Sequence, residues 1–334
     1  MDRRNFAFKT LPAAAALGAM ALPSRLFGGG AEAARSAARN LEPELKKFGV
    51  KFAPNIYKWT NLFPVSTKGM SVEEQMDFLG ELGFIAFEDN DFLSRKPEVQ
   101  DTIVAGAKKY GMQFGVFTMK LRGNFLLTMN IVAGSKKPDK PAALAASAAA
   151  ATEAAETARR IGAKWITVVP GQIPESRLNM DIFSNVVEHL RAMAKIFEPH
   201  GLVMVLEPLS FVPHPGWWLK TTAQAYALCK AVNSPACKIL FDIYHQQIEE
   251  GNLFRNIENH FDEIAYFHIG DVPKRTEPFS GEINYTNLIR HIVKLGYNGI
   301  LGMEHRLSDK SLEGERNLMR AYRALDEAAR SAAS

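Results

Sequence analysis

Short apolar runs rich in β-branched residues alternate, from residue 50 onward, with longer segments whose apolar positions recur at a helical spacing. The short runs predict eight strands, at residues 50–57, 84–88, 112–118, 165–169, 203–207, 239–243, 265–269 and 299–304. The longer segments predict eight helices, at residues 72–82, 98–110, 142–161, 182–199, 222–232, 253–260, 285–295 and 312–329. Several predicted helices end at a glycine just before the next strand, as at Gly83 and Gly111. Because glycine readily takes the left-handed conformation that ends a helix, these segments are short turns from helix to strand.

Eight strand and helix units in this order predict a single α/β domain, a (β/α)8 TIM barrel over residues 48–334. A doubly wound open sheet is the alternative fold, but no G-x-G-x-x-G string follows the first predicted strand, so a dinucleotide site has no support. The longest connection runs from Met119 to Pro141, after the third strand. In a barrel it lies on the face where active sites form, so it is either a lid over a substrate or a solvated loop.

The first 33 residues have the three parts of a secretory signal. Arg3 and Arg4 stand in a basic stretch, an apolar run covers residues 11–22, and an Ala-x-Ala string ends at Ala33. The paired arginines resemble a twin-arginine leader, so we expect a cleaved signal peptide at 1–33, a linker at 34–47 and an exported, periplasmic barrel. The apolar run is shorter than the roughly 18 residues that cross a membrane, so no stable membrane span is expected.

The formal net charge of +4 over 334 residues is divided unevenly along the chain. Residues 1–33 hold four basic side chains against two acidic ones, which leaves the predicted barrel close to neutral. A near-neutral body argues against nucleic acid or an acidic membrane surface as a partner. The two cysteines, Cys229 and Cys237, have a spacing that fits no cysteine-based metal site, and we expect two buried thiols. The sequence leaves open whether the protein is a homo-oligomer.

Four side chains that can bind metal end the last four predicted strands, and each follows an apolar run: Glu207, Asp242, His268 and Glu304. A carboxylate at the end of a buried strand is costly unless it is paired or bound to a cation. For any one of them an ion pair is a sufficient explanation, but the C-terminal ends of barrel strands meet on one face, so we expect the four together. Three carboxylates and one imidazole suit a divalent ion such as Mg²⁺ or Mn²⁺ better than zinc.

The same strand ends carry strings that resemble the hydroxypyruvate isomerase family of xylose isomerase-like TIM barrels. The strings are Glu-Pro-Leu-Ser (207–210), His-Pro-Gly-Trp-Trp-Leu (214–219), Phe-Asp-Ile-Tyr-His-Gln-Gln (241–247), Glu-Gly-Asn-Leu (250–253), His-Ile-Gly-Asp-Val-Pro-Lys-Arg-Thr-Glu-Pro (268–278) and Gly-Glu-Ile-Asn-Tyr (281–285). The resemblance is strongest from about residue 200 to 305, a third of the chain, and weaker over the first four units.

The resemblance implies a divalent metal with four protein ligands, which are Glu207, Asp242, His268 and Glu304. It implies that the two glutamates also serve as acid and base, and that His245 and Arg275 contact substrate oxygens. His214 lies in the loop after Glu207 and is a further candidate for substrate binding. The implied substrate is a small sugar or keto acid.

The expected reaction is isomerisation, with proton transfer at a carbon next to a carbonyl through a metal-stabilised enediolate. Pro213 stands where ketose 3-epimerases are expected to carry a further glutamate, which argues against that branch. Export conflicts with hydroxypyruvate, a cytoplasmic metabolite in most contexts, so an exported epimerase or lyase of keto-sugars or 3-keto-glycosides is the alternative. A non-catalytic sugar-binding barrel is a second alternative, and the near-neutral charge disfavours a multi-zinc nuclease.

Overall fold

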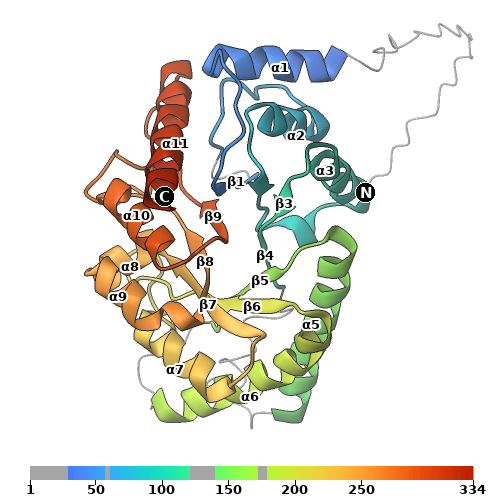
Figure 1. Ribbon diagram of the computed structural model, residues 1–334. Helices are drawn as coiled ribbons and strands as arrows, with labels where there is room; N and C mark the ends of the chain where they lie inside the picture. The colour runs from blue at the N-terminus through green and yellow to red at the C-terminus, as the bar shows by residue number, and fades with distance from the viewer. Residues whose placement is uncertain (1–28, 57–60, 121–139, 172–178, 334) are drawn as a thin grey trace, which may run out of the picture.

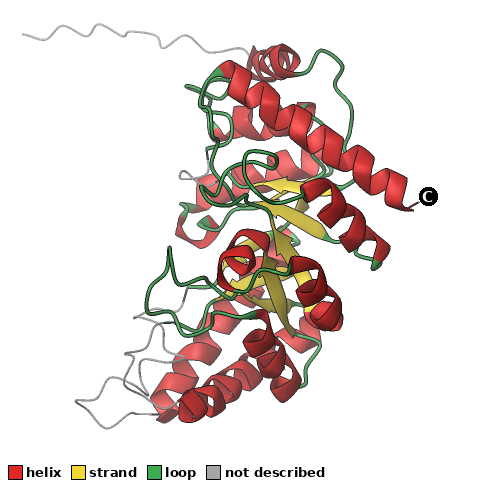
Figure 2. Cartoon of the chain, turned by 90° about the vertical axis from the view of Figure 1, so that its left-hand side faces the viewer, coloured by secondary structure: helices red, strands yellow, loops and turns green. Residues whose placement is uncertain are grey.

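Parallel strands curl into a barrel, and helices cover its outer side (Figures 1 and 2). The computed structural model describes residues 29–56, 61–120, 140–171 and 179–333. Its strands are β1 (Lys51–Pro54), β2 (Ala86–Phe87), β3 (Gln113–Phe114), β4 (Val116–Thr118), β5 (Trp165–Val168), β6 (Val203–Leu206), β7 (Cys237–Asp242), β8 (Ile264–His268) and β9 (Ile300–Met303). The α/β TIM barrel predicted from the alternation of strands and helices is confirmed.

Backbone pairing closes the barrel between its first and last strands. Seven strands pair in parallel in the order β1-β9-β8-β7-β6-β5-β4. β2 pairs with β3, and a bridge between Asn55 and Glu88 joins β1 to β2. β3 and β4 are consecutive in the chain and together take the place of one barrel strand. Gly115 separates them, so the single strand predicted at 112–118 is in two parts. An added Cβ at Gly115 would collide with the hydroxyl of Tyr266.

Each predicted helix is present, with its ends displaced by at most a few residues. The α-helices are α1 (Gly29–Leu41), α2 (Val72–Glu81), α3 (Pro97–Tyr110), α5 (Lys140–Ile161), α6 (Asn179–Phe197), α7 (Thr222–Val232), α8 (Ile243–Glu249), α9 (Leu253–His260), α10 (Tyr285–Lys294) and α11 (Leu312–Ala333). Short 3-10 helices are η1 (Phe92–Ser94), η2 (Glu198–His200) and η3 (Phe261–Glu263). Gly83 and Gly111 have φ values of +87° and +64°, which confirms their predicted role after α2 and α3.

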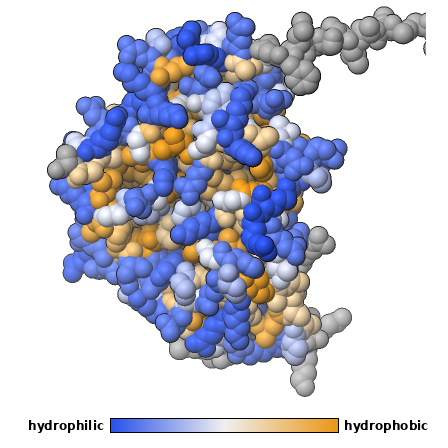
Figure 3. Space-filling model, turned by 45° about the vertical axis from the view of Figure 1, so that its right-hand side comes forward, coloured by the Kyte–Doolittle hydropathy of each residue, from blue (hydrophilic) through white to orange (hydrophobic). Residues whose placement is uncertain are grey.

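Two apolar layers stabilise the barrel. The inner layer lies inside the barrel and includes Ala53, Ala86, Val116, Leu240 and Tyr266. The larger outer layer lies between strands and helices and includes Phe52, Phe117, Phe241 and Phe267. On the face drawn in Figure 3, hydrophilic side chains surround smaller apolar areas. Because side chains alternate along a strand, His268 lies on the same inner side as Tyr266, one step nearer the C-terminal end of β8.

Residues 34–41 are helical and packed, which differs from the linker predicted at 34–47. They belong to α1, whose Ala34, Ala38 and Leu41 form a buried apolar stripe (Figure 1 shows α1 beside α2). The spacing of these three residues matches one face of a helix, so burial against the barrel's helices favours this conformation over an extended linker. The predicted cleavage point at residue 33 falls inside α1, and residues 1–28 lie outside the described residues, so the leader stays a prediction.

Three smaller predictions can be compared with the fold. Cys229 and Cys237 are buried free thiols, as expected. Most of the long connection after the third strand, residues 121–139, lies outside the described residues, so its predicted role stays a prediction. Within the described ranges, no helix combines the length and apolar character that a membrane crossing requires.

Asp326 on α11 joins the last helix to the start of β1. Its Oδ1 accepts hydrogen bonds from the backbone N–H groups of Gly49 and Val50, at 2.8 and 2.7 Å. Asp326→Ala removes this acceptor, and we expect the free energy of unfolding to fall by about 1.5–3 kcal/mol. Asp326→Asn keeps an accepting oxygen, so its free energy of unfolding should fall by less. The control is Glu327→Ala at the exposed neighbouring position, whose free energy of unfolding should hardly change. Urea unfolding measures all three, and equal losses for the Asn and Ala variants would contradict the role of these bonds.

Candidate active site

The four predicted ligands meet at the C-terminal mouth of the barrel. One ligand atom from each of Glu207, Asp242, His268 and Glu304 lies within 4.8 Å of the others. Asp242 and His268 are the last residues of β7 and β8, and Glu207 and Glu304 directly follow β6 and β9. All four side chains are buried, with at most 7% of each residue exposed. The prediction that these four side chains lie together at the strand ends is therefore confirmed.

Asp242 has two separate contacts, one through each oxygen. Oδ1 accepts hydrogen bonds from the backbone N–H groups of Tyr244 and His245, at 2.8 and 3.3 Å, and so begins α8, a helix that the sequence pattern did not predict. Oδ2 faces the site and accepts a hydrogen bond from Nη2 of Arg275 at 2.9 Å. The helix cap holds the carboxylate in place while one oxygen stays directed at the other ligands.

Nitrogen atoms of three residues surround the carboxylate of Glu304. Its Oε2 is 2.6 Å from Nη2 of Arg275 and 3.0 Å from Nδ1 of His268, and its Oε1 accepts a hydrogen bond from Nδ2 of Asn90 at 2.7 Å. Burial raises the pKa of Glu304, but the charges of His268 and Arg275 outweigh burial and hold the pKa well below its usual range. Glu304 is therefore ionised at neutral pH.

The pKa of Glu207 is shifted in the opposite direction to that of Glu304. Burial and the negative charge of Glu304 raise the pKa of Glu207 to about 7, although its contact with His268 opposes the rise. Nδ1 of His268 is 3.5 Å from Oε1 of Glu207. Two neighbouring carboxylates with pKa values displaced in opposite directions are typical of sites that exchange protons.

The donor set fits a divalent cation. Three carboxylates converge with an imidazole, and neither ring nitrogen of His268 makes a hydrogen bond within the described part of the chain. A buried nitrogen without a hydrogen bond, directed at two carboxylates, is suited to coordinate a metal through its lone pair. The absence of cysteine and the majority of oxygen ligands fit Mg²⁺ or Mn²⁺.

His245 lies beside the four ligands and presents one ring nitrogen to them. Its Nδ1 is 3.3 Å from the backbone N of Ser210, whose N–H donates to it, so the proton of the neutral ring is on Nε2. Nε2 is 3.6 Å from Oδ2 of Asp242. Burial and the positive charge of Arg275 hold the pKa of His245 well below its usual value, so the ring is neutral and offers an N–H donor to the site.

His214 and Arg275 also reach this face, as predicted. The ring of His214 is half-buried, 5.2 Å from the ring of His245 between centroids. Burial and Arg275 lower the pKa of His214. The Arg275 guanidinium lies over the ring of Tyr244, 5.1 Å from its centroid, in addition to its contacts with Asp242 and Glu304. A neutral imidazole and a fixed cation next to the ligands are suited to bind substrate oxygens.

A strained loop positions Arg275. The residue has a φ of +53°, which is uncommon for a side chain other than glycine. Asp271 stabilises the loop: its carbonyl accepts a hydrogen bond from the Arg275 N–H, and its carboxylate accepts from the N–H groups of Val272, Gly281 and Ile283. The loop after β8 is therefore folded so that the guanidinium points into the site.

Sequence reasoning assigned no role to several polar residues of the site: Glu88, Asn90 and Tyr266 contact ligands, and Ser210 contacts His245. Glu88 carried the same signal as the others, because it too is a carboxylate after a buried apolar strand. The side chains of Asn90 and Ser210 gave no comparable signal. His305, which follows Glu304 in the sequence, is buried, and its Nε2 lies 2.7 Å from the hydroxyl of Tyr322.

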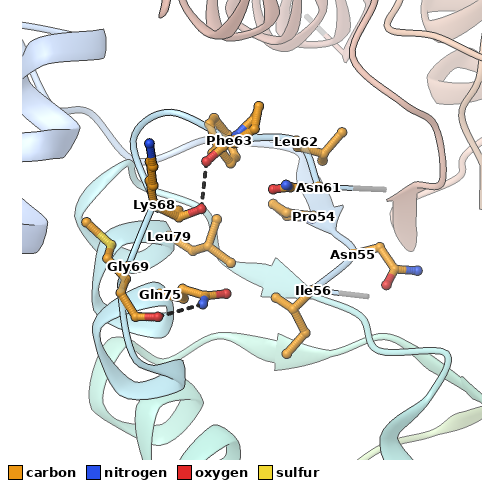
Figure 4. Close-up of a pocket in the computed structure, with 13 residues that line it drawn as sticks. Pro54, Asn55, Ile56, Asn61, Leu62, Phe63, Lys68, Gly69, Gln75 and Leu79 are labelled. Atoms are coloured by element: carbon orange, nitrogen blue, oxygen red, sulfur yellow. Dashed lines mark hydrogen bonds between the residues drawn. The ribbon is translucent and has the colours of Figure 1, made fainter. Parts of the chain in front are cut away.

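A cavity of about 410 Å³ lies beside the site, at the end of β1 (Figure 4). Its lining includes Asn55, Ile56, Leu62, Phe63, Lys68 and Gln75. None of the four ligands lines it, but Asn55 donates a hydrogen bond through Nδ2 to Oε1 of Glu88 at 3.2 Å. The cavity is thus next to the site without being part of it.

A family model described as "Xylose isomerase-like TIM barrel" matches residues 76–328. The chain belongs to this family. Hydroxypyruvate isomerase of Escherichia coli is 36% identical over 149 residues, which are 45% of this chain and 58% of that protein. 2-oxo-tetronate isomerase of Pectobacterium atrosepticum is 28% identical over 242 residues, which are 68% of this chain and 91% of that protein. The resemblance to hydroxypyruvate isomerases found in the strand-end strings is confirmed.

Solved structures of this xylose isomerase-like fold also match. One described as AP endonuclease, family 2, from Brucella melitensis has a TM-score of 0.64 and 25% identity, and the match covers 79% of this chain and 96% of that chain. The chain spans just under three fifths of the length of the E. coli relative.

Binding of a divalent cation should stabilise this xylose isomerase-like barrel against unfolding. With Mn²⁺ at a hundred times its dissociation constant we expect a gain of about 2.7 kcal/mol. Asp242→Asn keeps an oxygen to cap α8 but removes the negative charge directed at the site, so most of the gain should disappear. Thermal unfolding with Mn²⁺ and with EDTA measures the effect, and the exposed Asp309→Asn is the matched control. An undiminished gain in Asp242→Asn would exclude this carboxylate as a ligand.

Proposed function

We propose that the protein is a divalent-metal-dependent isomerase of a small sugar or keto acid. The observation that carries the proposal is the convergence of Glu207, Asp242, His268 and Glu304 within 4.8 Å at the mouth of the barrel. The relatives named hydroxypyruvate isomerase and 2-oxo-tetronate isomerase support the choice of an isomerase. Mg²⁺ or Mn²⁺ is the proposed ion, held by these four side chains.

Glu207 and Glu304 are the proposed acid–base pair. One carboxylate accepts the proton from the hydroxyl-bearing carbon next to the carbonyl, and the other, protonated at the start, gives a proton to the carbonyl carbon. The hydroxyl proton passes from one substrate oxygen to the other, and exchange with solvent restores the two carboxyl groups, so the net reaction moves a carbonyl without net oxidation. The chemistry that a divalent ion supplies when bound is Lewis-acid stabilisation of developing negative charge. A carboxylate is a weak base in water, so fixed positions and the exclusion of water contribute much of the acceleration.

His245 and Arg275 are proposed to bind and orient the substrate. The Nε2–H of His245 can donate to a substrate oxygen, and the Arg275 guanidinium can bind a carboxylate or hydroxyl group. The ring of His214 lies 5.2 Å from that of His245 between centroids and extends this polar side of the site. A substrate held by these donors would present its reacting carbons to Glu207 and Glu304.

Glu207→Gln and Glu304→Gln should each reduce turnover by about 10²–10⁴-fold, because each removes one member of the acid–base pair. The assay is release of product and entry of solvent deuterium into carbon, with Mn²⁺ and either hydroxypyruvate or a 3-keto-glucoside. The exposed Glu327→Gln is the control and should keep wild-type activity. Near-normal turnover in either site variant with metal bound would refute the assignment.

The two substrates distinguish the candidate reactions. Turnover of hydroxypyruvate supports the keto-acid isomerase, whereas turnover of the 3-keto-glucoside alone would support the exported epimerase or lyase. Binding of either compound with no deuterium exchange would support a non-catalytic sugar-binding barrel and refute the enzyme.

Export by the twin-arginine route is a separate part of the proposal, supported by the basic, apolar and Ala-x-Ala parts of residues 1–33. Changing both Arg3 and Arg4 to Lys should leave uncleaved full-length protein in the cytoplasm of a bacterium that has this pathway. Immunoblots of cell fractions measure the result, with Lys9→Gln as a control variant. Processing and export of the double Lys variant at the wild-type level would refute the twin-arginine assignment.

A further inference from the structure

Glu88 is a carboxylate buried inside the barrel, one residue beyond the end of β2. It has no exposed surface. Its Oε2 accepts a hydrogen bond from the hydroxyl of Tyr266 at 2.8 Å, and its Oε1 accepts one from Nδ2 of Asn55 at 3.2 Å. Burial of a carboxylate costs free energy, so its presence in the barrel interior calls for an explanation beyond packing.

Two glycines leave the space that the Glu88 side chain and its partners occupy. At Gly302 on β9, an added Cβ would collide with Oε2 of Glu88 and with Cδ2 of His268. At Gly115, an added Cβ would collide with the hydroxyl of Tyr266 and come to 3.2 Å from Cβ of Glu88. Tyr266, Glu88 and His268 therefore form a row of side chains that the barrel accommodates because Gly302 and Gly115, on two different strand positions, lack a side chain.

The ring of His268 is placed between two sets of carboxylates. Its Nδ1 faces Glu304 and Glu207, at 3.0 and 3.5 Å. Its Nε2 faces Oε2 of Glu88, at 3.4 Å. An imidazole that binds a metal through Nδ1 carries its proton on Nε2, and a buried N–H needs an acceptor. Oε2 of Glu88 lies 3.4 Å from Nε2 without a hydrogen bond between them, and Tyr266 fixes its position.

We propose that Glu88 is a positioning residue for the metal site: its carboxylate accepts the Nε2–H of His268, so that Nδ1 faces the cation with a free lone pair. The inference rests on the proposed function, because it assigns a partner to one of the proposed ligands. Carboxylates that accept a proton from a ligating histidine fix the ring and strengthen it as a ligand. Tyr266 and Asn55 act one step further away by holding the two oxygens of Glu88.

The test compares the dissociation constant for Mn²⁺ in the full-length protein and its variants, without substrate. Glu88→Met has a similar length and no acceptor, and should raise the dissociation constant by about 10–100-fold. Gly302→Ala keeps every polar atom but pushes on the Glu88 carboxylate and the His268 ring, and should also raise the dissociation constant. Asp89→Asn is the matched control, because Asp89 is the adjacent buried carboxylate and pairs with Arg95 instead of the site. Its Mn²⁺ affinity should stay within about threefold of wild type.

A spectroscopic measurement separates positioning from a purely structural role. In Mg²⁺-bound protein with ¹⁵N-labelled histidine, the ¹⁵N resonances of His268 show which ring nitrogen carries the proton, and His268→Asn assigns them. Because a metal on Nδ1 puts the proton on Nε2 in both proteins, the measure is the shift of the Nε2–H resonances. Wild type should show the shift of a hydrogen bond to a carboxylate, and Glu88→Met should lose this shift. Circular dichroism of the metal-free variants checks that the barrel is folded.

The outcomes decide between the inference and the proposal beneath it. If Glu88→Met and Gly302→Ala fold and bind Mn²⁺ within about twofold of wild type, Glu88 does not position His268 and the inference is wrong. If Glu88→Met does not fold, Gly302→Ala decides by the same comparison. If wild type itself binds no Mn²⁺, the proposed metal site fails, and the inference fails with it. If wild type binds Mn²⁺ and the variants bind it equally well, the inference about Glu88 is wrong and the proposed metal site stands.

Discussion

Negative charge buried at the mouth of the barrel is the constraint on which the rest of the structure depends. Three carboxylates meet in one site and a fourth lies directly behind it, all removed from water. Such a group of charges is stable only with cations or hydrogen-bond donors close by. Arg275 supplies positive charge and Asn90 supplies a hydrogen-bond donor, and the two residues come from different loops. A bound divalent cation would complete the same balance.

The loops at this face are built to bring those partners in. Arg275 has a left-handed backbone conformation that its neighbours impose through hydrogen bonds to Asp271. Asp242 is both a helix cap and a member of the site, so the start of α8 and the direction of the carboxylate are set by one side chain. Strain and dual roles of this kind concentrate where function requires a fixed geometry. The barrel provides the rigid frame that holds them.

A shared barrel does not by itself assign a reaction. The chain belongs to a family whose matching members include proteins named isomerases and a structure described as an AP endonuclease. Such proteins differ mainly in the side chains that their strand ends and loops carry at one face. Here those side chains include three carboxylates, three histidines and one arginine, a set suited to proton transfer at a carbon next to a carbonyl. The proposed chemistry therefore depends on the side chains at the mouth of the barrel, whereas the stability of the fold depends on its two apolar layers.

The sequence by itself determined the order of strands and helices and the four residues that end the last strands, because apolar periodicity and glycine turns are local signals. It also placed these four on one face, because parallel strands share their C-terminal side. Local signals did not show that residues 34–41 pack as a helix, since that depends on a surface made by distant helices. Only the tertiary structure decided that Glu88 faces His268 and that Asn90 reaches Glu304, 214 positions away. Closure of the barrel, which brings β2 across from β8 and β9, is the physical reason.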